Sequence, residues 1–178
     1  MLHGTRMLFM IGAIAFNVAC AYAAGNTFKA DDVVAFFEDQ KAIQNTRGIC
    51  VGLDDECAMA AIKDRSSAFD LLINFDKGSA ELTEDARQNL IEFSVALRNP
   101  KLASLHFAVD GFTDATGDDD YNLELSKRRA ESVVAFLQSM GVNDGMLRPR
   151  GWGETNFRMT DATDPANRRV ETRLIKSK

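Results

Sequence analysis

The chain has 178 residues, of which 46% are hydrophobic and 26% are charged, and it contains 12 Gly, 3 Pro and 3 Cys. This is the composition of a globular protein, and it excludes a collagen-like, a low-complexity or a disulfide-dense chain. The formal net charge of −5 argues against a nucleic-acid partner, because such proteins usually present a strongly basic face.

Residues 1–23 have the pattern of a cleavable export signal. A short stretch containing Arg6 precedes the uncharged run LFMIGAIAFNVACAYAAG, which ends in small residues. The pattern predicts cleavage after Ala23 and export of the remaining chain. An uncleaved inner-membrane anchor is an alternative, since about 17 apolar residues is the lower limit for a spanning helix. Acylation at Cys20 is a third, although Asn17 stands where a bulky aliphatic residue is expected.

Residues 24–68 are interpreted as an accessory N-terminal arm. Ala30, Val33 and Phe37 fall at helical spacing and predict one short amphipathic helix. After cleavage Cys50 and Cys57 are the remaining cysteines, and an even number in an exported chain predicts a disulfide between them. A pair of buried thiols is the alternative.

Residues 69–178 are predicted to form one domain, which begins with a strand and a helix. Alternating apolar residues over 69–75 indicate a strand with one buried face. Thr83 is the expected N-cap of a helix with Glu84 and Asp85 in its first turn, and Pro100 lies just beyond the last apolar residue of its stripe, Leu97.

The second half of this domain repeats the pattern. A strand is predicted over 105–112, a long helix over 121–140 with Gly141 as its end, and two further strands near 146–151 and 170–174. The expected fold class is therefore α/β: a two-layer α/β sandwich of βαβα-β-β order, with a mixed sheet and helices on one face.

The residues offer little for catalysis. After cleavage His106 is the remaining histidine, and no convincing nucleophile and base can be paired, so an enzyme is not expected. The acidic run from Asp114 to Asp120 lacks the glycine that an EF-hand loop needs at its sixth position. Acids that stabilise the start of the following helix explain this run better, and no metal or cofactor is predicted.

A binding site made of fixed charges is the stronger candidate. Asp114 follows the second predicted strand, while Asn122, Leu125 and Arg129 lie on one face of the next helix. Separated but convergent, Asp114 and Arg129 could hold the ammonium and the carboxylate of a zwitterion. A simple surface ion pair between them fits the spacing equally well.

Several separated blocks resemble the OmpA-like C-terminal domain, a family that binds peptidoglycan. They are INFDKGSAEL, VDGFTDATGDDDYNLELSKRRAESVVAFLQSMGV, RPRGWGE and DPANRRVETRL. The resemblance implies that Asp114 and Arg129 clamp the free amino-acid end of diaminopimelate in the stem peptide of the cell wall. It also implicates Phe75, Asp76, Thr113, Asn122, Leu125 and Arg168. Phe112 departs from the family, which usually has a histidine or another polar ring there.

The resemblance implies a non-catalytic protein that binds peptidoglycan in the periplasm and tethers or organises the cell envelope. An association with the outer membrane and with an outer-membrane or envelope protein is a further expectation. Two alternatives stay open: a stator-type or secretion-type wall anchor with an uncleaved N-terminal helix, and an enzyme that acts on wall fragments.

Overall fold

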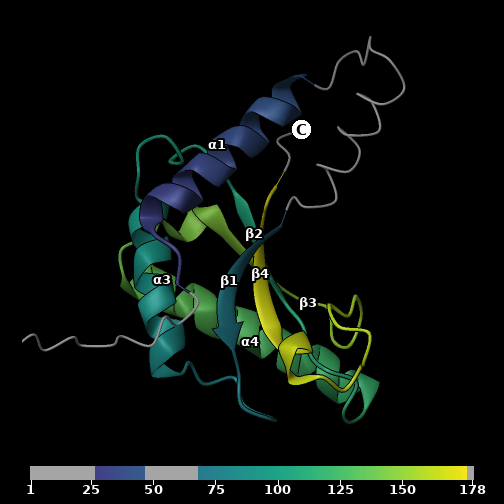
Figure 1. Ribbon diagram of the computed structural model, residues 1–178. Coiled ribbons are helices and arrows are strands. Elements are labelled where there is room, and N and C mark those ends of the chain that lie inside the picture. The colour runs from purple at the N-terminus through teal and green to yellow at the C-terminus, as the bar shows by residue number, and fades with distance from the viewer. Residues whose placement is uncertain (1–26, 47–67, 176–178) are drawn as a thin grey trace, which may run out of the picture.

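The computed structural model describes residues 27–46 and 68–175 (Figure 1). The elements in chain order are α1 (Ala30–Thr46), β1 (Ala68–Asn74), α3 (Glu84–Leu97), β2 (Phe107–Gly111), α4 (Asp119–Ser139), the short helix η1 (Asp144–Met146), β3 (Leu147–Gly151), the short helix η2 (Pro165–Asn167) and β4 (Arg169–Leu174). The strands and helices predicted within residues 69–178 are confirmed, with ends that differ by one or two residues. The helix predicted before them is also present, but α1 is longer than the short helix expected from Ala30 to Phe37.

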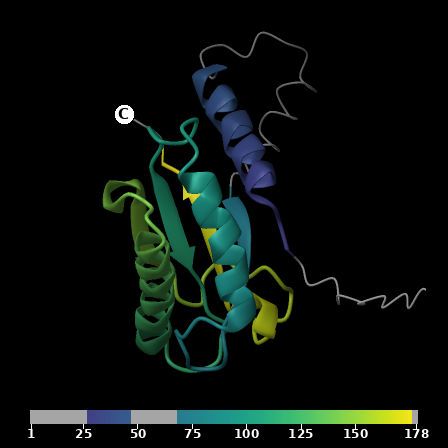
Figure 2. The same cartoon turned by 90° about the vertical axis from the view of Figure 1, so that its left-hand side faces the viewer.

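The four strands form one mixed sheet in the order β1-β4-β2-β3. β4 is antiparallel to both β1 and β2, whereas β2 and β3 are parallel. α3 and α4 cover one face of this sheet, as the side view shows (Figure 2). The predicted two-layer α/β sandwich of βαβα-β-β order is therefore confirmed, with α1 in addition before β1.

Local signals fix the ends of the two covering helices. The Thr83 hydroxyl accepts a hydrogen bond from the backbone N–H of Ala86 and caps α3. Asp118 caps α4 in the same way, and Asp119 and Asp120 follow in its first turn. The acidic run thus stabilises a helix start, as expected for negative charges near the positive end of a helix dipole. Beyond the end of α4, Gly141 adopts a φ of 85° that favours glycine.

Helix α1 packs into the same core as the rest of the fold. Val33 and Phe37 are fully buried and belong to one continuous hydrophobic cluster with Leu71 and Phe107 of the sheet. Six phenylalanines form a cluster where α1 contacts α3 and the sheet: Phe28, Phe36, Phe37, Phe69, Phe93 and Phe107. The contacting rings have centroids 4.8–6.4 Å apart and are mostly edge-to-face. Buried aromatic pairs of this geometry stabilise beyond their burial alone.

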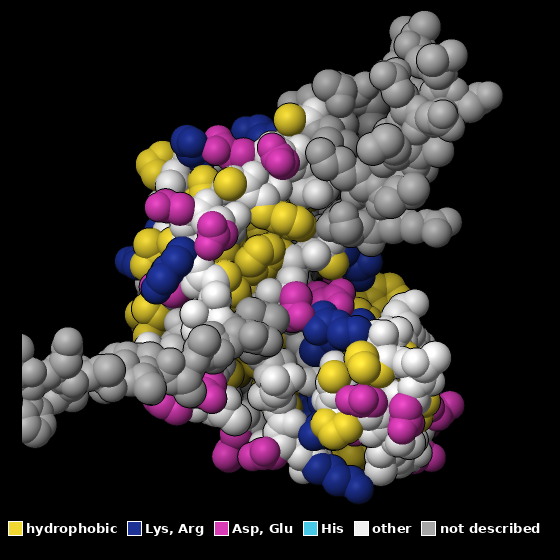
Figure 3. All heavy atoms as spheres, viewed as in Figure 1, with side chains coloured by type: hydrophobic (Ala, Val, Ile, Leu, Met, Phe, Trp, Pro, Cys, Tyr) yellow, Lys and Arg dark blue, Asp and Glu magenta, His cyan; other side chains and the backbone are white. Residues whose placement is uncertain are grey.

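The face of the sheet opposite α3 and α4 is polar. On this face Asp110 of β2 is fully buried and accepts hydrogen bonds from Arg150, Trp152 and Arg173. Basic and acidic side chains gather beside β4 in the space-filling view (Figure 3). Each buried oxygen of this carboxylate has hydrogen-bond donors, so the polar face is an ordered network.

The export signal at 1–23 and the predicted Cys50–Cys57 disulfide lie outside the described residues. Within the described part of the chain, no helix is long and apolar enough to cross a membrane.

Candidate functional site

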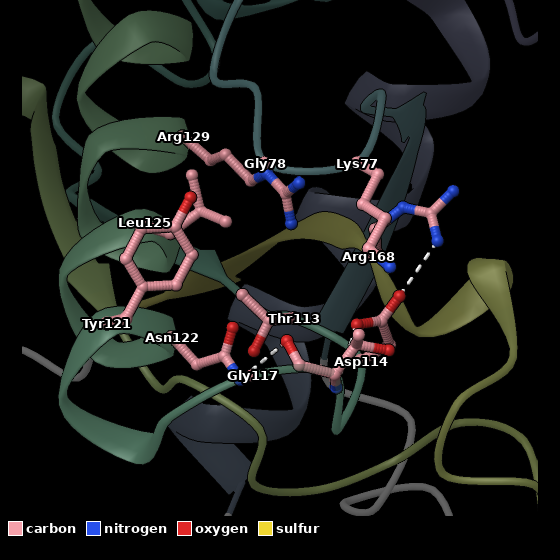
Figure 4. Close-up of a pocket in the computed structure, with 11 residues that line it drawn as sticks. Lys77, Gly78, Thr113, Asp114, Gly117, Tyr121, Asn122, Leu125, Arg129 and Arg168 are labelled. Atoms are coloured by element: carbon pink, nitrogen blue, oxygen red, sulfur yellow. Dashed lines mark hydrogen bonds and ion pairs between the residues drawn. The ribbon is translucent and has the colours of Figure 1, made fainter.

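A cavity of about 230 Å³ opens where β2 ends, between the first half of α4 and the loop that follows β1 (Figure 4). Eleven residues line it: Lys77, Gly78, Thr113, Asp114, Thr116, Gly117, Tyr121, Asn122, Leu125, Arg129 and Arg168. They come from three segments that are distant in sequence, and the sheet order brings these segments together. β4 pairs with both β1 and β2, so the residue before β4, Arg168, reaches the loops after both of those strands.

Asp114 supplies the negative charge of the cavity. Its carboxylate accepts a hydrogen bond from Arg168 at 2.8 Å and another from the backbone N–H of Thr116 at 3.1 Å. Burial opposes ionisation, but the bonds from Arg168 and Thr116 outweigh it and lower the pKa of Asp114 below its ordinary value. Asp114 is therefore an anion throughout the neutral range.

Arg129 of α4 supplies a positive charge that lies entirely below the surface. Its guanidinium donates to the backbone carbonyl oxygens of Ser79, Asp76 and Phe112 at 2.9–3.3 Å. The ring of Phe75 lies 5.0 Å from its central carbon. Burial, and next the nearby charge of Arg168, lower the pKa of Arg129 to about 10. The side chain is still a cation at neutral pH, and its described bonds go to carbonyls rather than carboxylates.

The spacing had left a surface ion pair between Asp114 and Arg129 open, and that alternative is wrong. Both side chains line one cavity, but the ion pair of Asp114 is formed with Arg168. Arg129 is fully buried, and its guanidinium donates hydrogen bonds to carbonyl oxygens in the loop after β1. Arg128, its neighbour in sequence, is exposed and does not line the cavity, as the helical rotation predicts.

Thr113 adds an unusual feature to the floor of the cavity. Its side chain is 1% exposed, and its hydroxyl oxygen has no hydrogen-bond partner among the described residues. Buried polar atoms are nearly always paired, so this hydroxyl is an exception among the described side chains. Beside it, the Asn122 amide donates to the Glu154 carboxylate at 2.8 Å, and this bond fixes its orientation.

Six of the eight candidate residues from the sequence therefore line one cavity: Thr113, Asp114, Asn122, Leu125, Arg129 and Arg168. Phe75 and Asp76 do not line it, but their carbonyl oxygens accept hydrogen bonds from Arg168 and Arg129 respectively. The sequence reasoning did not name five lining residues: Lys77, Gly78, Thr116, Gly117 and Tyr121. Tyr121 lies four residues before Leu125, so helical periodicity could have placed it on the same face. No comparable pattern indicated Lys77, which lies in a loop.

The layered architecture defines a small α/β sandwich domain with a charged cavity at the end of a central strand. The model of the OmpA family matches residues 74–171, which is more than half of the chain. The chain belongs to the OmpA family.

Similar proteins agree with this assignment. Outer membrane protein A of Atlantibacter hermannii is 43% identical over 89 residues, which are 49% of this chain and 35% of that protein. Outer membrane protein A of Klebsiella pneumoniae is 38% identical over 87 residues, which are 49% of this chain and 25% of that protein. The match thus covers about a third or less of these relatives.

Solved structures show the same fold. The C-terminal domain of MotB from Helicobacter pylori is 26% identical with a TM-score of 0.53, and the match covers 59% of this chain and 84% of that one. The peptidoglycan-associated lipoprotein of Burkholderia pseudomallei is 23% identical with a TM-score of 0.51, covering 62% of this chain and 90% of the other.

Proposed function

We propose that this protein binds peptidoglycan without catalysis, through the diaminopimelate of the stem peptide, and so tethers or organises the cell envelope. One observation carries the proposal. The carboxylate of Asp114, the guanidinium of Arg129 and the unpaired hydroxyl of Thr113 all line one cavity. Opposite charges held apart in one cavity fit a zwitterion, and the free end of diaminopimelate carries an ammonium and a carboxylate on one carbon.

In this proposal each end of the zwitterion has its own partner. The ligand carboxylate accepts from Arg129, the ligand ammonium donates to Asp114, and Thr113 bonds to either group. Each charge-assisted hydrogen bond contributes about 1.5–3 kcal/mol. Because Asp114 already binds Arg168, the ammonium must share or displace that partner, and the affinity of one site is expected to be modest. Many copies of the ligand along a polymer then raise retention by avidity.

Family membership supports an envelope location, since matching relatives are named Outer membrane protein A. We propose that residues 1–23 are removed on export to the periplasm. In this proposal residues 24–68 form an N-terminal segment that contains a Cys50–Cys57 disulfide, and its helix α1 packs onto the binding domain formed by residues 69–178. An outer-membrane or other envelope protein is the proposed second partner.

Sedimentation with insoluble peptidoglycan tests the binding site. We expect the wild type to sediment with the polymer and both Asp114→Ala and Arg129→Ala to remain in solution. Arg128→Ala is the matched control, because it removes an exposed charge one residue from Arg129, and it should sediment like the wild type. Far-UV circular dichroism must show that each variant is folded, and Arg129→Lys provides a milder second variant. Wild-type binding by folded Asp114→Ala and Arg129→Lys would contradict the clamp.

A mass-spectrometric assay tests the absence of catalysis. Purified protein is incubated with peptidoglycan, and the supernatant is compared with that of the polymer alone. We expect the same soluble fragments in both samples. New fragments that the Asp114→Ala protein does not release would instead favour an enzyme that acts at this cavity.

A further inference from the structure

The cavity carries more positive than negative charge. Lys77, Arg129 and Arg168 line it as cations, and Asp114 is its one acidic lining residue. The excess is local, because the whole chain has a formal charge of −5. The carboxylate of Glu154 accepts a hydrogen bond from Asn122 at 2.8 Å, but Glu154 does not line the cavity.

The described partners leave two of these cations without a carboxylate. Arg168 is paired with Asp114 at 2.8 Å. Arg129 is bound to carbonyl oxygens, which carry only partial charges. Lys77 is exposed at the rim and has no ion pair among the described residues. The lowered pKa of Arg129, caused by burial and then by Arg168, agrees with an excess of cations in this space.

A single zwitterion does not balance this charge. Its ammonium adds one positive charge and its carboxylate one negative charge, so the cavity remains as cationic as before. A ligand with two carboxylates and one ammonium would remove part of the excess. Lys77 and Arg168 lie on one side of the cavity, across from Tyr121 and Leu125 (Figure 4), so the second carboxylate would lie on the Lys77 side.

We propose that the cavity selects a stem-peptide end that bears a second free carboxylate, and that Lys77 is the residue that discriminates a free carboxylate from its amide. This inference rests on the proposed function and specifies the chemical form of the ligand. The second carboxylate is the one at the peptide-bonded end of diaminopimelate, which is free when the stem ends there. An amide at that position keeps the shape but removes the charge that Lys77 attracts.

Isothermal titration calorimetry of the full chain tests this inference with two synthetic stem peptides that end in diaminopimelate. In one peptide the second carboxyl group is free, and in the other it is amidated. We expect the free acid to bind about fivefold more tightly, the upper range for a partly exposed ion pair. Lys77→Gln should bind both peptides with the affinity that the wild type has for the amide. Lys127→Gln, an exposed helical lysine paired with Glu131, should keep the wild-type preference.

The outcomes separate the two proposals. Equal affinity of the wild type for both peptides would overturn the selectivity but leave the binding function standing. A Lys77→Gln protein that still prefers the free acid would overturn the role of Lys77. Absence of binding of either peptide to the folded wild type would overturn the proposed function and this inference together.

Discussion

Asp114 and Arg168, 54 residues apart in sequence, form an ion pair of 2.8 Å at the cavity. Arg168 also donates to the carbonyl oxygen of Phe75 at 3.0 Å. The guanidinium of Arg168 therefore links the loop after β2 to the residue that follows β1. Arg168 itself directly precedes β4. The pair positions the acid of the site and also connects three strands.

A double-mutant cycle should reveal this coupling. Asp114→Asn and Arg168→Gln each leave a partly buried charge without its partner, so each should lower the free energy of unfolding by about 1–3 kcal/mol. The double variant should lose clearly less than the sum, because contacting residues couple by about 0.5–3 kcal/mol. Urea denaturation of the four proteins measures the coupling, and strict additivity would mean that the pair does not stabilise the fold.

The lowered pKa of Asp114 predicts how stability depends on pH. The folded state holds the carboxylate ionised below the ordinary carboxyl pKa, so the unfolded chain takes up the proton first as the pH falls. The contribution of Asp114 is therefore fully present above about pH 5 and is lost as the pH falls through the lowered pKa. The unfolding free-energy difference between the wild type and Asp114→Asn should be constant from pH 7 to 5 and shrink in stronger acid. A difference that grows on acidification would indicate a raised pKa.

The fold could be predicted because its signals are local and agree with one another. Phe69, Leu71 and Ile73 alternate in β1, and Thr83 and Gly141 mark helix ends that the structure confirms. The burial of α1 against Phe107 was not predicted. The apolar stripe of α1 shows that it has a buried face, but periodicity does not identify the surface on which that face packs.

The site could be predicted only in part, for a similar reason. Helical spacing brings Asn122, Leu125 and Arg129 together, because their relation is fixed within one helix. The partner of Asp114 depends on strand order: β4 lies between β1 and β2, and this order brings Arg168 to Asp114. Long-range pairing of this kind has no signature in the spacing of either segment.

The close approach of β2 to α4 predicts a strict requirement for glycine at position 111. A Cβ on Gly111 would collide with the backbone carbonyl of Ser126, which cannot move without bending α4. Gly111→Ala should therefore lower the free energy of unfolding by at least about 2 kcal/mol. Gly145→Ala is the matched control, since its Cβ would meet only a side-chain oxygen of Asn143 at 3.1 Å. Similar melting temperatures for the two variants would contradict the packing described here.

The contribution of α1 can be measured at Phe37. Its ring is fully buried and lies 4.8 Å from that of Phe107. Phe37→Ala should lower the free energy of unfolding by about 3–5 kcal/mol, because it removes a large buried ring and leaves a cavity. Phe157→Ala, at a side chain that is 40% exposed, should change it by less than about 0.5 kcal/mol. A small effect at Phe37 would mean that α1 does not contribute to the stability of the domain.

The position of β4 within the sheet has a consequence for biosynthesis. β4 is the last of the described strands in sequence, yet it is the only bridge between β1 and the β2–β3 pair in the described sheet. During synthesis β1, β2 and β3 are made before the strand that joins them, so this sheet can close only after residue 174 has been added. A stop codon anywhere before residue 174 should therefore prevent this sheet from closing, however late in the domain it falls.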